Sequence, residues 1–206
     1  MYNQDLFSEL EDSAIRVVSY DGHVEYKGGL LPFQEANHFF DSLLKHIDWQ
    51  HDHIIRFDQV IKTKRKVAFY AEKPFHYRYS NTTKVAFPWT PALLTLKKLV
   101  EVETGAYFNA CLLNLYHDGE EGMAWHSDRE IELQERGIIA SLSLGAERKF
   151  SFKHKQNNDV ISVLLQHGSL LTMKGDTQHY WLHCLPISKK VKAPRINLTF
   201  RMFKEN

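Results

Sequence analysis

The stretch Arg195-Ile196-Asn197-Leu198-Thr199-Phe200-Arg201 near the end of the chain alternates polar and apolar side chains at every position. Successive side chains of a β-strand point to opposite faces of the sheet, so the alternation predicts a strand with one apolar and one polar face. The apolar face is expected to pack in a core. The polar face has an arginine at each end and therefore needs a partner of its own.

Five segments before this strand have the short, alternating pattern of further strands. They are Cys111 to Tyr116, Ile138 to Leu144, Lys149 to Lys153, Val160 to Leu165 and Ser169 to Met173. Turn-forming residues occur between them, at Asp118-Gly119, Asn157-Asn158-Asp159 and His167-Gly168. Several antiparallel strands in this order predict a double-stranded β-helix, that is, a jelly roll or cupin-like barrel.

Two helices are expected before the strands, which places the chain in the α+β class. From Pro32 to Ile47, apolar residues repeat at the three-and-four spacing of one helical face. A second helix is expected to begin at Thr90, with Pro91 in its first turn and Gly105 just past its end. We expect these N-terminal helices to buttress one sheet of the jelly roll.

The composition is that of an ordinary globular protein. The chain has 206 residues, 43% of them hydrophobic and 13% aromatic, which is enough to bury a sizeable core in a single domain. No repeat, low-complexity tract or Pro/Gly/Ser-rich linker divides it. With 26 basic and 25 acidic side chains the formal net charge is +1, so a nucleic-acid partner would have to meet a local basic patch.

Cysteine usage and the N-terminus favour a cytoplasmic protein. Cys111 and Cys184 form no CxxC pair and no disulfide framework, and they are expected to be small buried side chains. Met1 to Tyr20 carries several acidic residues, and no stretch of about 18 apolar residues occurs anywhere. We therefore expect no membrane partner, and a monomer is the default expectation.

His126-Ser127-Asp128 and the later His183 are candidate metal ligands. Two imidazoles and one carboxylate can occupy one face of an octahedral ion and leave three positions open, as in non-haem Fe(II) oxygenases. The His-x-Asp spacing suits a strand end, because residues two apart project from the same side. The third ligand can come from a non-adjacent strand of a jelly roll, so the three residues predict a catalytic iron site. The remaining histidines, including His117, His154, His167 and His179, are expected in turns or on the surface.

The polar face of the last strand predicts an acid-binding wall. Arg195 and Arg201 are separated by roughly 20 Å of strand, so they are expected to reach into a cavity from opposite ends. A small dicarboxylate would fit, because a guanidinium stays charged and pairs with carboxylate in a bidentate manner. Asn114 and Tyr116 alternate with leucines and could supply neutral hydrogen bonds to the same acid. The alternative is a solvated strand face with two surface arginines.

Six motifs occur together in one order: Asn114-Leu115-Tyr116, His126-Ser127-Asp128, Ile139 to Ser143, His167 to Leu171, His183, and Arg195 to Arg201. In order and spacing they closely resemble the AlkB-type iron(II) and 2-oxoglutarate-dependent dioxygenases. The resemblance covers roughly residues 60 to 203 and is loose over the first 50. It implies that His126, Asp128 and His183 bind Fe(II). It also implies a 2-oxoglutarate pocket, lined by Asn114, Tyr116, Arg195, Asn197, Thr199 and Arg201.

The resemblance further implies an activity, the oxidative demethylation of N-alkylated bases in DNA or RNA as direct-reversal repair. Dioxygen and 2-oxoglutarate would be cosubstrates, and formaldehyde, succinate and CO2 would be released. A base inside a duplex cannot reach buried iron, so the substrate must be single-stranded or flipped out. The implied organisation is one dioxygenase domain over 1–206. It comprises an N-terminal extension of the same core over about 1–60, a nucleotide-recognition segment over about 61–90 and a jelly-roll catalytic core over about 109–203.

Aromatic and basic residues are interleaved in the expected nucleotide-recognition segment, as stacking and phosphate contacts require. Tyr77-Arg78-Tyr79 resembles the part of AlkB-like proteins that lies over the nucleotide, and Tyr70 is a third candidate. Arg129 and Glu130 follow the iron motif directly, where the family places residues that touch the base or its strand. For Phe69, Phe75 and Trp89, ordinary core packing is the favoured interpretation.

Two other functions remain open from the sequence. The same dioxygenase chemistry could act on a protein side chain or a small metabolite, which the near-zero net charge permits. A non-catalytic jelly-roll binding module could also have kept the fold without the chemistry. The preference between DNA and RNA, and between single and double strands, is not predicted.

Overall fold

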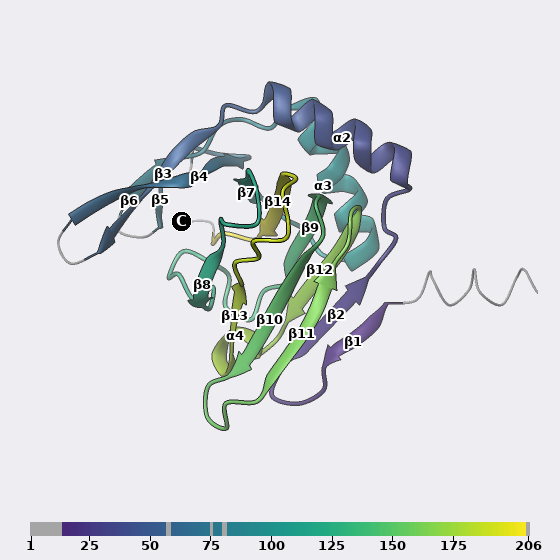
Figure 1. Cartoon of the computed structure of the whole chain (residues 1–206), viewed down its shortest axis with the longest axis vertical. Helices are drawn as coiled ribbons and strands as arrows, with labels where there is room; N and C mark the ends of the chain where they lie inside the picture. The colour runs from purple at the N-terminus through teal and green to yellow at the C-terminus, as the bar shows by residue number, and fades with distance from the viewer. Residues whose placement is uncertain (1–13, 57–58, 75, 80–81, 205–206) are drawn as a thin grey trace, which may run out of the picture.

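The computed structural model describes residues 14–56, 59–74, 76–79 and 82–204, and the side chains of these residues outside 53–60 and 76–84. Two antiparallel sheets form the body of the molecule (Figure 1). The larger sheet has eight strands, in the spatial order β1 (Ile15–Val18), β2 (His23–Lys27), β12 (Ser169–Lys174), β9 (Ile139–Gly145), β14 (Arg195–Arg201), β7 (Ala110–Tyr116), β4 (Gln59–Ala71) and β3 (Gln50–Arg56).

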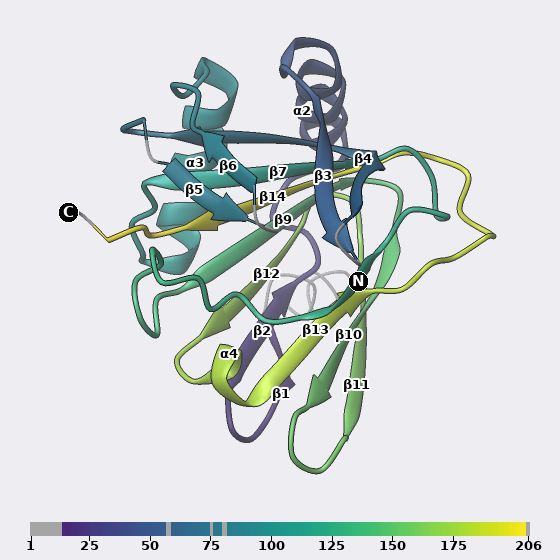
Figure 2. The ribbon, with the colours of Figure 1, turned by 90° about the vertical axis from the view of Figure 1, so that its left-hand side faces the viewer.

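The smaller sheet has four strands, in the order β11 (Val160–Leu165), β10 (Arg148–His154), β13 (Trp181–Leu185) and β8 (Met123–His126). A separate ribbon pairs β5 (His76–Tyr79) with β6 (Thr82–Val85). From β7 onward the chain crosses back and forth between the larger and the smaller sheet, which is the interlocking path of a jelly roll. Figure 2 shows the result as two layers, with β10, β11 and β13 below β7, β9 and β14. The predicted α+β jelly roll is confirmed.

Helices α2 (Phe33–His46) and α3 (Pro91–Thr104) cover the outer face of the larger sheet, as Figure 1 shows. Each begins and ends where the sequence predicts. The Thr90 hydroxyl accepts a hydrogen bond from the Leu93 backbone N–H at 3.3 Å, which caps α3. Gly105 ends this helix with a φ of 64°, a left-handed conformation that glycine adopts without strain. A third short helix, α4 (Thr177–Tyr180), precedes β13.

The main hydrophobic core lies between these two helices and the larger sheet. It contains the apolar face of β14, namely Ile196, Leu198 and Phe200, together with Leu43 of α2 and Leu96 of α3. Because side chains alternate along the strand, the opposite polar face of β14 must point between the two sheets. All seven residues of β14 are nevertheless buried, so its polar side lines an interior space and not the solvent.

Other predictions about the core have mixed outcomes. Phe69 is buried and Trp89 packs against the main core, whereas Phe75 lies outside the described residues. Cys111 and Cys184 are both buried and unpaired, as expected. The prediction for His154 was wrong: it is 2% exposed, and its ring lies 4.9 Å from that of Trp181. In the described part of the chain, no helix is both long enough and apolar enough to cross a membrane.

Candidate metal centre and acid-binding pocket

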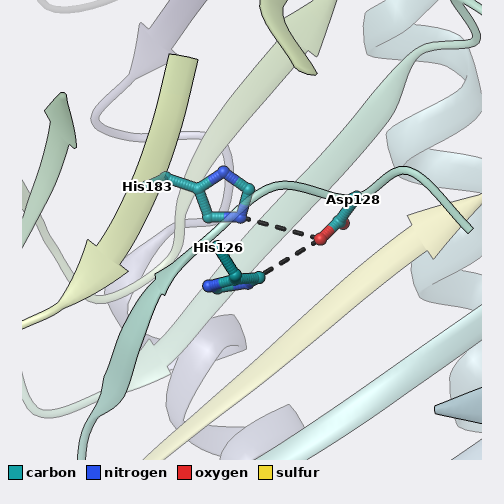
Figure 3. A group of neighbouring side chains, drawn as sticks. All are labelled: His126, Asp128 and His183. Carbon is teal, nitrogen blue, oxygen red and sulfur yellow. Dashed lines mark ion pairs between the residues drawn. The ribbon is translucent and has the colours of Figure 1, made fainter. Parts of the chain in front are cut away.

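His126, Asp128 and His183 meet at the mouth between the two sheets (Figure 3). His126 ends β8, and the antiparallel pairing of β8 with β13 places His183 directly opposite it. Asp128 follows two residues later, in the loop that leaves β8. Its Oδ1 lies 3.7 Å from Nε2 of His126 and 3.7 Å from Nε2 of His183. The jelly-roll crossing has therefore brought together ligands that are distant in the sequence.

The protonation of the triad suits a divalent cation. Burial, with a smaller contribution from His126, lowers the pKa of His183 to about 3, so its imidazole is neutral near pH 7. Burial alone would raise the pKa of Asp128, but the Arg201 guanidinium and the two imidazoles hold it well below its usual range. A neutral imidazole and an ionised carboxylate are the forms that bind metals, so the donor set fits Fe(II).

Neighbouring groups fix the orientation of the ligands. Arg201 donates from Nε and Nη2 to Oδ2 of Asp128, at 3.0 and 2.6 Å, which leaves Oδ1 facing the histidines. Nδ1 of His126 lies 2.8 Å from the Ala124 carbonyl oxygen. A carbonyl can only accept, so Nδ1 carries the proton and Nε2 keeps its lone pair for a metal. The Asp128 backbone N–H donates to Oε1 of Gln178 at 2.8 Å and anchors the loop.

The predicted acid-binding residues line one pocket with the triad. Strands β14 and β7 are neighbours, with Arg195 opposite Tyr116 and Asn197 opposite Asn114. The residues that the structure gathers there are Asn114, Tyr116, Arg195, Asn197, Thr199 and Arg201. All six are buried, so the alternative of a solvated strand face is wrong.

Arg195 carries a buried charge at the end of the pocket remote from Arg201. Its Nη2 donates to Oγ of Ser143 at 2.8 Å and to Oδ1 of Asn197 at 2.7 Å. Arg195 is 2% exposed, its Nε has no hydrogen-bond partner, and within the described residues no carboxylate pairs with it. Burial lowers the pKa of Arg195 to about 10, which still leaves it charged at neutral pH. A buried cation without a counter-ion is costly, so the pocket is suited to an anionic ligand.

The two arginines therefore have different tasks. Arg201 is tied to the candidate metal ligand Asp128, whereas the Arg195 charge has no carboxylate partner among the described residues and is available to a bound anion. This agrees with the expectation that they act at opposite ends of one cavity.

Asn114 is held by a buried network that the sequence did not reveal. Arg65 donates through Nη1 to Oδ1 of Asn114 and through Nη2 to Oδ2 of Asp52, the latter at 2.7 Å. Because a guanidinium can only donate, the oxygen of the Asn114 amide faces Arg65 and its NH2 group is turned elsewhere. Asp52 and Arg65 are 0% and 6% exposed. Arg65 lies in the segment where basic and aromatic residues are interleaved, but nothing in the sequence indicated that it is buried, and nothing drew attention to Asp52.

Ser141 and Ser143 were also missed as site residues. Ser141 Oγ donates to Oδ1 of Asn197 at 2.9 Å, and Ser143 accepts from Arg195. Both lie on β9, which pairs with β14 on the side away from β7. Their alternation with Ala140, Leu142 and Leu144 was a usable signal, since it places both hydroxyls on the face that the β14 polar residues share.

A larger cavity of about 450 Å3 adjoins the triad at Asp128 and Arg201. The loop after Asp128 and the α4 region form its walls. Arg129 and Glu130, the two candidate substrate contacts of this loop, are among the lining residues. The ion pair between Arg136 and Asp176, at 2.7 Å, joins the two walls.

The other predicted substrate residues are placed differently. Tyr70 is 4% exposed and belongs to the main core, where its ring lies 5.7 Å from that of Phe87. It lines neither of the two cavities. Tyr77, Arg78 and Tyr79 form most of β5, but their side chains lie outside the described set.

A jelly roll with a His-Asp-His triad beside a buried cationic pocket is the arrangement of an oxygenase that uses iron and a 2-oxo acid. A family model described as the 2OG-Fe(II) oxygenase superfamily matches residues 23–201, so the chain belongs to this superfamily. Within it the chain is of the AlkB type, since curated AlkB proteins are similar over most of its length.

Two human relatives illustrate the similarity. "Alpha-ketoglutarate-dependent dioxygenase alkB homolog 3" of Homo sapiens is 39% identical over 196 residues, which cover 90% of this chain and 65% of that protein. "DNA oxidative demethylase ALKBH2" of Homo sapiens is 38% identical over 178 residues, covering 81% of this chain and 68% of that protein. The chain thus spans just under two thirds of the length of the alkB homolog 3 relatives.

A solved structure described as "The structure of OsALKBH1" superposes with a TM-score of 0.65 at 16% identity, covering 92% of this chain and 100% of that one. At this level of identity the likeness shows the fold alone.

Proposed function

We propose that this protein is an Fe(II)- and 2-oxoglutarate-dependent dioxygenase that removes N-linked alkyl groups from bases of DNA or RNA. The observation that carries the proposal is the buried, unpaired charge of Arg195 in the same pocket as the His126, Asp128 and His183 triad. A dicarboxylate with a 2-oxo acid group at one end could satisfy both ends of that pocket. The names of the relatives, DNA oxidative demethylase among them, support the substrate class.

Each residue of the site has a role in this proposal. His126, Asp128 and His183 would hold the iron, and Arg201 would orient Asp128. Arg195 would bind the distal carboxylate of 2-oxoglutarate, and Asn114, Tyr116, Asn197 and Thr199 would line its path with neutral polar groups. When bound, iron and 2-oxoglutarate use dioxygen to hydroxylate an N-alkyl carbon, giving succinate, CO2 and, after loss of formaldehyde, the repaired base. The protein itself needs no nucleophile, because it supplies position and a largely dry cavity.

The cavity beside Asp128 is proposed as the place of the damaged base. Its volume of about 450 Å3 lies within the usual range of small-molecule sites. A nucleotide in a duplex would have to be flipped to reach it. Arg129 and Glu130 of its wall are proposed contacts, together with Tyr77, Arg78 and Tyr79 of β5. Tyr70 has less support, since it is packed in the core.

The proposed organisation keeps the boundaries expected from the sequence. Residues about 1–60 extend the core, about 61–90 recognise the nucleotide, and about 109–203 form the catalytic jelly roll of a single domain. Strands β1 to β4 support this, since they join the same sheet as β7, β9, β12 and β14. A monomer located in the cytoplasm is proposed with it.

A panel of N-methylated single- and double-stranded DNA and RNA oligonucleotides tests the function. The purified protein would be incubated with Fe(II), ascorbate and 2-oxoglutarate, and formaldehyde and demethylated base would be measured. We expect turnover of at least one N-methylated base. Succinate formation without demethylation of any base would instead favour a protein side chain or a metabolite as substrate. A fully metallated protein that forms no succinate under any condition would be a non-catalytic binding module.

A further inference from the structure

We infer that Arg148 is a positioning residue that shapes the distal end of the acid pocket and thereby selects 2-oxo acids with a second carboxylate. The inference rests on the proposed function, because it concerns the pocket in which 2-oxoglutarate would bind. Arg148 begins β10, is 1% exposed and does not itself line the pocket. Its role must therefore be exerted through the residues that it touches.

Arg148 holds two loops together by donating to their backbone carbonyl groups. Its Nη2 lies 2.8 Å from the carbonyl oxygen of Glu121 and 2.8 Å from that of Pro186. It also donates to the carbonyl groups of Asp118 and Gly119, at 3.2 and 3.4 Å. Three of these acceptors lie in the loop between β7 and β8, and the fourth lies in the loop between β13 and β14. A planar guanidinium has enough donors to serve both loops at once, which a lysine ammonium does not match.

The two loops also pack directly against each other. The Gly119 backbone N–H donates to the Val191 carbonyl at 2.9 Å, and the Ser188 N–H donates to the Gly119 carbonyl at 2.7 Å. A Cβ atom at Gly119 would stand 2.0 Å from the Ser188 carbonyl oxygen, so the loops touch without room for a side chain. Separation of these loops would break the whole set of contacts.

These loops lead directly into the distal end of the pocket. The β7–β8 loop starts after Tyr116, the last residue of β7, and the β13–β14 loop ends at Arg195, the first residue of β14. Tyr116 and Arg195 are register partners in the sheet. The guanidinium carbons of Arg148 and Arg195 lie 5.9 and 5.6 Å from the centre of the Tyr116 ring. Arg148 therefore fixes the two residues that would receive the far end of a bound diacid.

Arg148 also adds positive charge to this end of the pocket. It donates to carbonyl groups and lies over an aromatic ring, and among the described residues no carboxylate forms an ion pair with it. Two buried guanidiniums thus share one tyrosine ring, and the nearby carboxylates of Asp118 and Glu121 act on Arg148 without forming an ion pair with it. Such a field favours a ligand carboxylate placed beside Arg195, and a 2-oxo acid without this second carboxylate gains less from it.

The inference can be tested by comparing how tightly two 2-oxo acids bind, in an experiment that does not depend on catalytic activity. The wild-type protein, Arg148→Met and Arg148→Lys would be loaded with Mn(II), and the dissociation constants of 2-oxoglutarate and pyruvate would be measured by calorimetry. Pyruvate keeps the 2-oxo acid group and lacks the distal carboxylate. We expect Arg148→Met to weaken 2-oxoglutarate at least tenfold and pyruvate less than threefold, with Arg148→Lys between the wild type and Arg148→Met. Arg16→Met, at an exposed arginine of β1, is the matched control and should change neither constant.

The outcomes separate the inference from the proposed function. If the Mn(II)-loaded wild type does not bind 2-oxoglutarate, the proposed function fails. If it does bind and the Arg148 variants weaken both acids by the same factor, or neither, the inference is overturned. Should Arg148→Met fail to fold, the same ratio measured on Arg148→Lys decides.

Limited trypsin digestion of the metal-free variants gives a second readout of the loop contacts. Cleavage after Lys189, Lys190 or Lys192 should be faster when Arg148 is replaced and unchanged in Arg16→Met. Equal cleavage rates in all folded variants would contradict the loop-joining role.

Discussion

The two carboxylate oxygens of Asp128 face different neighbours, and this arrangement suits the residue to bind a metal. Oδ2 accepts both hydrogen bonds from Arg201, while Oδ1 stands 3.7 Å from both histidines. Removal of the carboxylate takes away the one negative charge of the triad and leaves the Arg201 guanidinium beside the two imidazoles, an arrangement that repels a cation. We expect Asp128→Ala to lose Fe(II) binding and at least about 100-fold of the rate of succinate formation, because even groups that only contact a metal ligand contribute about 10–100-fold.

Metal content and succinate formation would be measured on the same samples of Asp128→Ala. The matched control is Asp159→Ala, at an exposed carboxylate that accepts a hydrogen bond from Tyr20 far along the sheet. It should retain metal and activity. Unchanged activity of Asp128→Ala would mean that the assigned triad is wrong.

Arg65 contributes both to the stability of the fold and to the orientation of the pocket residue Asn114, because it donates hydrogen bonds to Asp52 and to Asn114. Removal of one member of a buried ion pair leaves the other buried charge without that partner and typically costs about 3–5 kcal/mol. We expect Arg65→Met to lower the free energy of unfolding by this amount and also to weaken 2-oxoglutarate binding, since the Asn114 amide can then turn. Urea unfolding and calorimetry would measure the two effects.

A double variant separates the two effects of Arg65. Arg65→Met combined with Asp52→Asn removes the buried charge and should recover part of the stability. It should not recover the affinity for 2-oxoglutarate, because Asn114 still lacks its donor. Recovery of both would show that Arg65 acts on the pocket only through overall stability.

At the scale of single elements, the helix ends were the features most directly predictable from the sequence. Thr90, Pro91 and Gly105 each favour one position at a helix end, and the structure uses all three in that way. We expect Thr90→Ala to lower the free energy of unfolding by about 1 kcal/mol, because the Leu93 N–H loses its acceptor. Thermal or urea unfolding would measure it.

Thr95 in the same helix is the matched control for that cap. Its hydroxyl is exposed and donates to the Pro91 carbonyl, a group that an α-helix already uses. Thr95→Ala should therefore be neutral or slightly stabilising. A loss equal to that of Thr90→Ala would indicate a general effect of threonine replacement and not of capping.

Strand β14 was predictable for a similar reason: its period of two follows from side-chain geometry alone. The same rule does not reveal which strand lies beside it. The pairing of β14 with both β7 and β9 gathers Asn114, Ser141 and Ser143 around Asn197 and Arg195. The polar face of β14 becomes a pocket only when β7 and β9 lie on either side of it. Ser141 and Ser143 of β9 were missed because the sequence does not show that β9 is one of these neighbours. Arg148 was missed because its partners are backbone carbonyl groups, which no side-chain pattern records.

At the scale of the whole molecule, the jelly-roll crossing explains how a triad can form from residues far apart. The sequence predicts the sheet, the helices and the candidate ligands, and the resemblance to AlkB-type proteins supplies their order in space. The ion pair of Asp52 with Arg65 and the burial of His154 depend on the tertiary arrangement, which local patterns do not determine. The near-zero net charge likewise says only that any nucleic-acid contact must be local.

The unpaired charge of Arg195 predicts that ligand binding stabilises the entire fold. A ligand that binds only the folded state adds about 2.7 kcal/mol when present at about 100 times its dissociation constant. In a chain of this length each kcal/mol raises Tm by about 2–4 °C, so Mn(II) with 2-oxoglutarate should raise Tm by about 5–10 °C over the chelator-treated protein. Pyruvate with Mn(II) should give a smaller rise, because it leaves Arg195 without a carboxylate.

Differential scanning calorimetry would compare these samples with Arg195→Met, whose rise with 2-oxoglutarate should fall to that seen with pyruvate. An identical Tm with and without metal and diacid would contradict the assignment of this pocket, since a buried cation that gains its counter-ion must stabilise the folded state.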